Sequence, residues 1–482
     1  MNLVNKKKYN VLAAAIWYVA GNVLVKGVAF FVLPIFTKLM TTEEYGIFSI
    51  YASYLSIVEV IALFGLSSTV RISKYDTNID YEKYVATIIY VPAALCLAFA
   101  IPLNIILAFK GEFLSMNSSL WNYLLSTASI AAISNIVCAK QIIDGKYKLH
   151  TLYSISFTLL NAGISIALAY TIFRNHDIHM SRVIGQFISQ GIATLLLVVF
   201  SKTIRKIDIK YLKQAFIWGM PLLLHTLATV VLTQTDKIVI KYLDGYSSAG
   251  IYGVAVTFVA IPLVVYTSFE GAWAPWFYSK INENEYSNIR SFNNIYIIGM
   301  AFMVSIFMLA APTLIMLFTD NAYWESMYSL VPLTASVFFE MTYGICVSVE
   351  YFYKKTWYIT VGTVAAVAFN IALDVLFVTL WGYIAAAYAT VLSKIILFVF
   401  HFFISKRINK ESMFNILYLF GSIVLIGGTV ALSLLFSKTL WVRLIIAFVW
   451  LAAFVAIIIK NRESFKDVLG SKKKKENITC EE

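Results

Sequence analysis

Residues 11–39 read VLAAAIWYVAGNVLVKGVAFFVLPIFTKL and are almost entirely apolar. A helix needs about 20 apolar residues to cross the hydrocarbon core of a bilayer, whereas the apolar core of a signal peptide has about 7–15. The segment is therefore too long for a signal peptide, and it lacks a convincing cleavage site. With lysines at positions 6–8 before it, the segment is predicted to be an uncleaved membrane-spanning helix.

The composition extends this conclusion to the whole chain. Hydrophobic side chains make up 60% of the 482 residues and charged ones only 13%, and the mean hydropathy is +0.78. Apolar runs of about twenty residues recur, unlike the roughly ten-residue alternation of an outer-membrane barrel. The sequence thus predicts an all-α integral membrane protein. The net charge is +12, and the basic residues lie in short segments between the apolar runs. They therefore indicate orientation and not a nucleic-acid partner.

Cutting the sequence at polar and charged clusters predicts about fourteen transmembrane helices. Their approximate ranges are 11–39, 45–70, 84–108, 121–139, 151–173, 181–200, 215–240, 249–272, 293–318, 327–351, 357–380, 384–404, 413–436 and 440–459. No connection exceeds about twenty residues, so no folded soluble domain is expected. The sequence has no glycine-rich loop ending in Gly-Lys-Ser/Thr, which argues against ATP hydrolysis by this chain.

The lysines and arginines predict how the bundle is oriented. Of the 38 such residues, about 28 fall on the side of the two termini and about 7 on the opposite side. Cytoplasmic segments of membrane proteins carry an excess of Lys and Arg. Both termini are therefore predicted to be cytoplasmic, in a multi-pass protein of a bacterial cytoplasmic membrane.

Segments about 205 residues apart resemble each other, which suggests an internal duplication. Residues 38–48, KLMTTEEYGIF, and residues 241–252, KYLDGYSSAGIY, each contain a lysine, a turn and then Gly-Ile-aromatic. Residues 165–168 and 370–373 match at the same offset. An even number of spans separates the copies, so the halves should share one orientation. The predicted division is a lobe of about six helices in 1–213, another of about six in 214–410, and a helix pair with a basic cytoplasmic tail in 411–482.

Asn22, Lys26 and Glu59 are the polar side chains that most need an explanation. A charge at mid-bilayer costs about 2.5–3.5 kcal/mol on insertion scales. Lys26 lies near the middle of the first span with Asn22 one turn earlier, and Glu59 lies at a similar depth in the second. One interpretation places Lys26 against an anionic group of the substrate, with Glu59 tuning it or carrying a coupling proton. The other is a buried Lys26–Glu59 ion pair that only fixes the helix hairpin.

Further candidates lie at span ends and in later spans. Arg71 and Lys140 end spans on the predicted cytoplasmic side, where a diphosphate or lipid headgroups would meet them. Asp374 and Lys394 lie deeper, in neighbouring spans. His225 is a candidate proton relay, although a hydrogen-bonded core histidine is the commoner case. The candidates for binding a coupling ion are Glu59, His225 and Asp374. No residues have the spacing of a metal site, and no cofactor is expected.

The first helix hairpin resembles a known protein family. It carries Gly21-Asn22, Lys26-Gly27, Pro34, Lys38-Leu39, Glu44-Tyr45-Gly46 and LFGLSSTVR at 63–71. With the runs 221–237 and 249–252, these motifs are similar to those of Wzx-like oligosaccharide flippases of bacterial polysaccharide biosynthesis. That family belongs to the multidrug, oligosaccharidyl-lipid and polysaccharide exporter superfamily. The resemblance covers essentially the whole chain.

The resemblance implies a V-shaped pair of lobes that accepts a polyprenyl-diphosphate-linked repeat unit at the cytoplasmic face and releases it outside. Basic cleft residues in the first two spans of such proteins imply similar roles for Lys26 and Arg71. Glu59 departs from a strongly cationic cleft. The implied partners are the lipid-linked oligosaccharide and membrane lipids, with a polysaccharide polymerase and glycosyltransferases beside them.

Three alternatives have the same hydropathy pattern. A drug or cation exporter of this fold would depend on the acids Glu59, Glu340 and Asp374 and not on Lys26. A peptidoglycan-precursor flippase would differ mainly in its cargo. An integral-membrane glycosyltransferase would need a longer loop carrying acids or histidines, so a secondary transporter is expected and not an enzyme.

Overall fold

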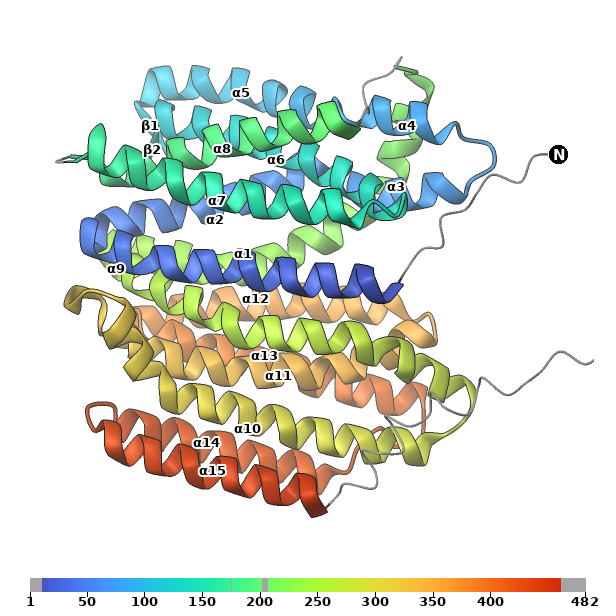
Figure 1. Ribbon diagram of the computed structural model, residues 1–482, viewed down its shortest axis with the longest axis vertical. Helices are drawn as coiled ribbons and strands as arrows, with labels where there is room; N and C mark the ends of the chain where they lie inside the picture. The colour runs from blue at the N-terminus through green and yellow to red at the C-terminus, as the bar shows by residue number, and fades with distance from the viewer. Residues whose placement is uncertain (1–10, 175, 202–206, 461–482) are drawn as a thin grey trace, which may run out of the picture. The chain divides into compact units, whose positions relative to one another are not determined.

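The computed structural model of the protein describes residues 11–174, 176–201 and 207–460. Nearly all of these residues lie in α-helices (Figure 1). The chain divides into two compact units, Met1–Gly253 and Val254–Glu482. The predicted all-α membrane architecture is confirmed.

The first unit is a succession of helices joined by short connections. Its helices are α1 (Val11–Leu39), α2 (Thr42–Leu63), α3 (Leu66–Tyr75), α4 (Tyr81–Ile88), α5 (Val91–Lys110), α6 (Ser118–Ile143), α7 (Tyr147–Thr171) and α8 (Ile178–Ser201). An antiparallel hairpin of β1 (Glu112–Phe113) and β2 (Met116–Asn117) joins α5 to α6. The long helix α9 (Lys210–Asn282) begins in the first unit and ends in the second.

The second unit is built around α11. Its elements are α10 (Tyr286–Phe318), a 3-10 turn (Asn321–Tyr323), α11 (Ser326–Phe352), α12 (Thr356–Trp381), α13 (Ala385–Ile408), α14 (Ile416–Leu435) and α15 (Leu440–Lys460). In the most apolar stretch of α11, 83% of the residues are buried, against 6% in α15. α11 packs against α10 and α13, α12 packs against α13, and α14 and α15 pack against α10.

The predicted number of spans agrees with the structure. Among the described residues, 12 helices are long and apolar enough to cross a membrane, with α2–α3 and α4–α5 each counting as one. One of the 12, α9, has 73 residues and consists of two helices that meet at Gly245, where φ is 90°. Counting α9 twice and adding the 29-residue α1 gives the fourteen spans expected from the sequence.

The second predicted span, 45–70, is broken near its end. α2 stops at Leu63, and Phe64 and Gly65 adopt left-handed conformations with φ of 49° and 70° before α3 begins. Glycine occupies this region freely, whereas it is uncommon for a bulky residue such as phenylalanine. The break places the candidates Glu59 and Arg71 on different helices.

Local sequence fixes the start of α2. The Thr41 hydroxyl accepts a hydrogen bond from the amide of Glu44, and the Glu44 carboxylate accepts one from the amide of Thr41. The same carboxylate accepts a 2.8 Å hydrogen bond from the amide of Ile178. The capping box therefore also ties the beginning of α2 to the beginning of α8.

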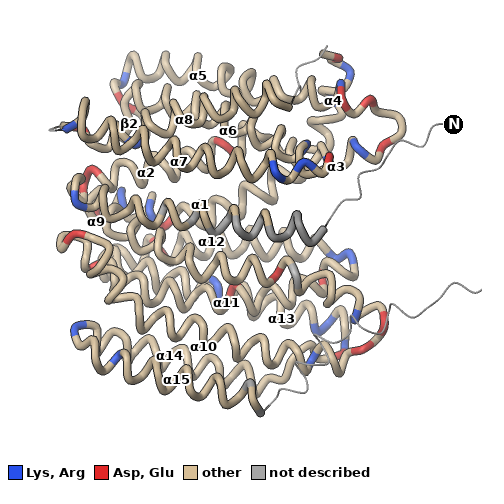
Figure 2. The backbone as a smooth tube through the Cα atoms, viewed as in Figure 1, with Lys and Arg blue, Asp and Glu red and all other residues tan. Residues whose placement is uncertain are grey.

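Charged residues are distributed as a bilayer requires. In each unit they gather near the helix ends and are sparse along the middle of the helices (Figure 2). Charge is costly in hydrocarbon, so those that do lie within spans need partners or a function.

Candidate functional site

Glu59 on α2 is hydrogen-bonded within the first unit. Asn135 on α6 donates from Nδ2 to Oε1 of Glu59 over 2.7 Å. An amide is a neutral donor, so this bond satisfies the carboxylate without cancelling its charge. Asn22 and Lys26 lie on α1, but their side chains fall outside the described part of the structure. The two interpretations of Lys26 therefore both stay predictions.

Lys140 lies in an ion cluster at one end of the first unit. Its Nζ is 3.1 Å from Oε1 of Glu82 and 2.8 Å from Oδ2 of Asp144, and Lys74 reaches Asp144 at 3.0 Å. Burial raises the pKa of the Asp144 carboxyl, but hydrogen bonds from Lys140 and Lys74 outweigh this and lower the pKa below its usual value. Lys140 is thus buried with two carboxylate partners, whereas Arg71 on α3 is exposed.

The other predicted candidates lie on α9, α12 and α13. Lys394 on α13 lies 2.9 Å from Oε2 of Glu340 on α11, a pairing that the sequence did not predict. Asp374 on α12 is fully buried, and Asn370 one turn earlier is buried as well. His225 lies half-buried on α9, in the first unit.

Sequence reasoning missed a buried acid–histidine pair. Nδ1 of His401 on α13 lies 2.6 Å from Oε1 of Glu350 on α11, and both side chains have 0% exposure. The only signal in the sequence was the position of His401 within an apolar span. A histidine buried there needs a hydrogen-bond partner. Its partner is 51 residues away in the chain, so spacing did not reveal it.

The two repeated segments contact each other. The hydroxyls of Thr42 and Ser247 share a 2.7 Å hydrogen bond. Gly46 on α2 faces Gly250 on α9 so closely that a Cβ atom on Gly46 would overlap the carbonyl oxygen of Tyr246. A Cβ atom on Gly250 would overlap the carbonyl oxygen of Thr42. The contact is therefore reciprocal, and only residues without a side chain allow the backbones to approach this closely.

A second close contact lies at the other end of α2. A Cβ atom on Gly65 would lie 2.6 Å from the carbonyl oxygen of Gly219 on α9, and one on Gly219 would overlap that of Phe64. The rings of Phe64 and Phe216 pack edge to face with centroids 4.9 Å apart. α9 therefore contacts the α2–α3 segment at both ends of α2, and Glu59 lies between the two contacts.

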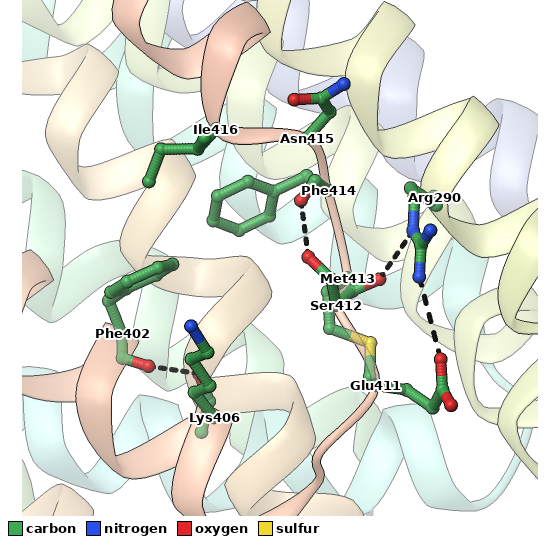
Figure 3. Close-up of a pocket in the computed structure, with 10 residues that line it drawn as sticks. Arg290, Phe402, Lys406, Glu411, Ser412, Met413, Phe414, Asn415 and Ile416 are labelled. Carbon is green, nitrogen blue, oxygen red and sulfur yellow. Dashed lines mark hydrogen bonds and ion pairs between the residues drawn. The ribbon is translucent and has the colours of Figure 1, made fainter.

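A cavity of about 350 Å³ opens in the second unit, between the start of α10, the end of α13 and the α13–α14 connection (Figure 3). Arg290 donates from Nε to the carbonyl oxygen of Ser412 over 3.1 Å and lies 3.6 Å from Glu411. The Lys406 side chain lies across the cavity from Arg290 (Figure 3). Ser405 also lines the cavity, one turn beyond the histidine of the acid–histidine pair.

Solved structures with the same fold are transporters and flippases. A structure described as lipid II flippase MurJ in an inward closed conformation has a TM-score of 0.71 and 18% identity, and the match covers 92% of this chain and 99% of that one. An inward-facing multidrug resistance MATE family transporter of the MOP superfamily has a TM-score of 0.62 and 13% identity, covering 80% and 96%. A MOP superfamily transporter from Pyrococcus furiosus gives 0.53 and 15%, covering 82% and 95%. The likeness shows that this chain has the fold of these transporters.

The sequence itself identifies the family. No curated protein sequence matches the chain significantly. The family described as polysaccharide biosynthesis protein matches residues 11–281, which is more than half of the chain. The matched range includes both repeated segments and both glycine contacts. This chain therefore belongs to the polysaccharide biosynthesis protein family and has the MOP superfamily transporter fold.

Proposed function

We propose that the protein flips a polyprenyl-diphosphate-linked oligosaccharide repeat unit from the cytoplasmic to the outer leaflet of a bacterial cytoplasmic membrane, for surface polysaccharide biosynthesis. The observation that carries this proposal is the union of a polysaccharide biosynthesis family with the fold of MOP transporters. Such a chain would handle a polysaccharide precursor inside the membrane. Flipping breaks no covalent bond, so the protein would act as a secondary transporter and not as an enzyme.

The chemistry of this cargo assigns roles to the polar candidates. Its diphosphate is anionic, and Arg71 and Lys26 would attract it, Arg71 from an exposed position on α3. Asn22 and Lys394 would donate hydrogen bonds to the diphosphate or the sugars. Lys140 would contribute to the same cytoplasmic site within its ion cluster. The prenyl tail would stay in lipid.

Alternating access requires a closure at each face of the membrane. The contact of Gly46 with Gly250 would form the outer closure, and the contact of Gly65 with Gly219 the cytoplasmic one. Both are made largely by backbone atoms. The cytoplasmic contact lies beside a buried cluster that includes Leu66, Val70 and Ala215, so its opening would also separate these side chains. Gly245, where α9 changes direction, would supply a hinge beside the outer closure.

The moving parts and the energy source follow from the same scheme. The predicted lobes, 1–213 and 214–410, would move against each other. Residues 411–482 would be an appendix, and both termini would lie in the cytoplasm.

The membrane potential is an available energy source. Each charge that crosses with the transmembrane potential supplies about 2.3 kcal/mol per 100 mV. Glu59, His225 and Asp374 are the proposed carriers of a coupling ion. Glycosyltransferases would supply the cargo, and a polymerase would consume it.

Two other cargoes are each favoured by one comparison. The likeness to a lipid II flippase favours a peptidoglycan precursor, and the likeness to multidrug transporters favours a drug or cation. Both likenesses concern the fold alone, whereas the family match concerns polysaccharide biosynthesis. We therefore place the oligosaccharide first.

Deleting the gene in its host tests the proposal. The lipid-linked repeat unit should accumulate on the cytoplasmic leaflet while surface polysaccharide disappears, and the intact protein should restore both. An unchanged glycan together with a peptidoglycan defect would favour the peptidoglycan precursor. An unchanged glycan with increased drug sensitivity would favour drug export.

A further inference from the structure

The Glu350–His401 pair stands apart from the other ion pairs. Of those in the described part of the chain, it alone joins two side chains with 0% exposure. Replacing a buried ion pair by apolar residues is often neutral or stabilising, so stability alone is a weak reason for placing one inside a membrane protein. Both groups of this pair can bind and release protons.

The geometry places one proton between the two groups of the pair. Two lone pairs cannot face each other across 2.6 Å, so one proton lies between Nδ1 of His401 and Oε1 of Glu350. With that proton alone the pair carries a net negative charge. A second proton, on Nε2 of the ring, makes it neutral, and burial favours the neutral state. The ring then carries a proton on Nε2 and shares the other with the carboxylate.

The neighbouring side chains do not compete with the pair for this proton. From α11, the titratable neighbours are Tyr343, whose ring centroid lies 5.0 Å from that of His401, and Cys346 and Tyr351. From α12 the neighbour is Gly362, which is not titratable. No lysine or arginine forms an ion pair with Glu350 among the residues that the structure describes.

Access to Nε2 is controlled by α12. A Cβ atom on Gly362 would overlap Nε2 of His401, so the backbone of α12 covers the nitrogen that carries the second proton. Ser405 follows His401 by one turn on α13 and lines the cavity described above. A displacement of α12 would uncover the ring.

We propose that Glu350 and His401 form a proton-binding site that couples proton movement to cargo flipping. The pair takes one proton from water while α12 is displaced, holds it while α12 covers the ring, and returns it to water when α12 moves again. No other bond forms or breaks. This inference rests on the proposed flippase function and adds a coupling site to it.

The test uses the full chain in proteoliposomes with lipid-linked oligosaccharide, at several pH gradients. One proton per cycle allows the accumulation ratio of the cargo to change by up to about tenfold for each pH unit. The double variant Glu350→Gln/His401→Gln keeps a neutral hydrogen-bonded pair but holds no exchangeable proton, so it should flip cargo without responding to the gradient. His150→Gln, which removes a half-buried histidine of α7, should respond like the unmodified protein.

The outcomes separate the two proposals. A gradient response that persists in the double variant, or that is missing in the unmodified protein while cargo still flips, overturns the proton site and leaves the flippase standing. If no cargo flips under any gradient, the proposed function fails. Nitrogen-15 NMR of the 5 histidines then tests the site alone, with His401 assigned by His401→Gln. Two ring protons at pH 7.5, falling to one in Glu350→Gln, support the site, and equal protonation in both proteins overturns it.

Discussion

Gly46 and Gly250 meet backbone to backbone, at matching positions of two segments that resemble each other in the sequence. Gly46 abuts the carbonyl oxygen of Tyr246, and Gly250 abuts that of Thr42. A side chain at either glycine would meet a carbonyl group that cannot rotate away. The resemblance between the segments thus coincides with a reciprocal contact between them.

Replacing Gly46 or Gly250 by alanine should destabilise the protein. The added methyl group overlaps backbone, and overpacking of this kind typically costs about 1–3 kcal/mol. Thermal unfolding in detergent should therefore occur at a lower temperature in each variant. Gly163→Ala is the matched control, because nothing lies within 4 Å of a Cβ atom there. Unfolding of Gly46→Ala at the unmodified temperature would contradict the close contact.

Locking the outer closure should stop export. The hydroxyls of Thr42 and Ser247 are 2.7 Å apart, so Thr42→Cys/Ser247→Cys should form a disulfide on oxidation, in a background where the chain's 4 cysteines are replaced. Export should cease with oxidant and return with reductant, and each single variant should be insensitive to both. Continued export by fully cross-linked protein would show that this contact does not open.

Acid should weaken the ion cluster around Asp144. Its pKa is lowered in the folded protein, so the cluster's contribution to stability is complete above the unfolded pKa of about 3.9 and is lost as pH falls through the lower folded value. Asp144→Asn removes it at every pH. We expect a difference in unfolding free energy of about 1 kcal/mol at pH 6, because solvent screens part of the interaction. The difference should shrink below about pH 4, and one that grew on acidification would contradict the assignment.

Glu59→Gln separates the charge of Glu59 from its hydrogen bond. The amide oxygen of glutamine can still accept from Asn135, so the variant should fold and reach the membrane. Export should fall at least about tenfold if the charge contributes 1.4 kcal/mol to the transport cycle. Asn135→Leu instead leaves the carboxylate without this donor and should destabilise the fold by about 1–3 kcal/mol. Normal export by Glu59→Gln would reduce Glu59 to a structural role.

Lys26→Ala should abolish export while the folded protein still reaches the membrane, because the ammonium group is proposed to meet the anionic cargo. Lys26→Arg keeps the positive charge and should retain part of the activity. Export of the lipid-linked repeat unit and the amount of protein in the membrane fraction are the two measurements. Normal export by the alanine variant would show that Lys26 serves the fold only.

The sequence located the spans because the bilayer acts on each segment separately. Every segment that crosses lipid must be apolar and must satisfy its own backbone hydrogen bonds, so residues 11–39 were recognisable as a helix without knowledge of their neighbours. The break at Phe64 and Gly65 was missed, because it interrupts an apolar run without a change in hydropathy. Its close approach to Gly219 involves a residue far along the chain.

The sequence by itself therefore determined the all-helical class, the number of spans and the polar side chains that require an explanation. Only the tertiary structure decided which groups meet: Asn135 with Glu59, Glu340 with Lys394, and Glu350 with His401. The physical reason is that lipid-facing and protein-facing sides of a span are both apolar, so hydropathy does not indicate which side of a helix contacts another. Partners in space, such as α11 and α13, are also separated in the chain by a further helix, and only packing brings them together.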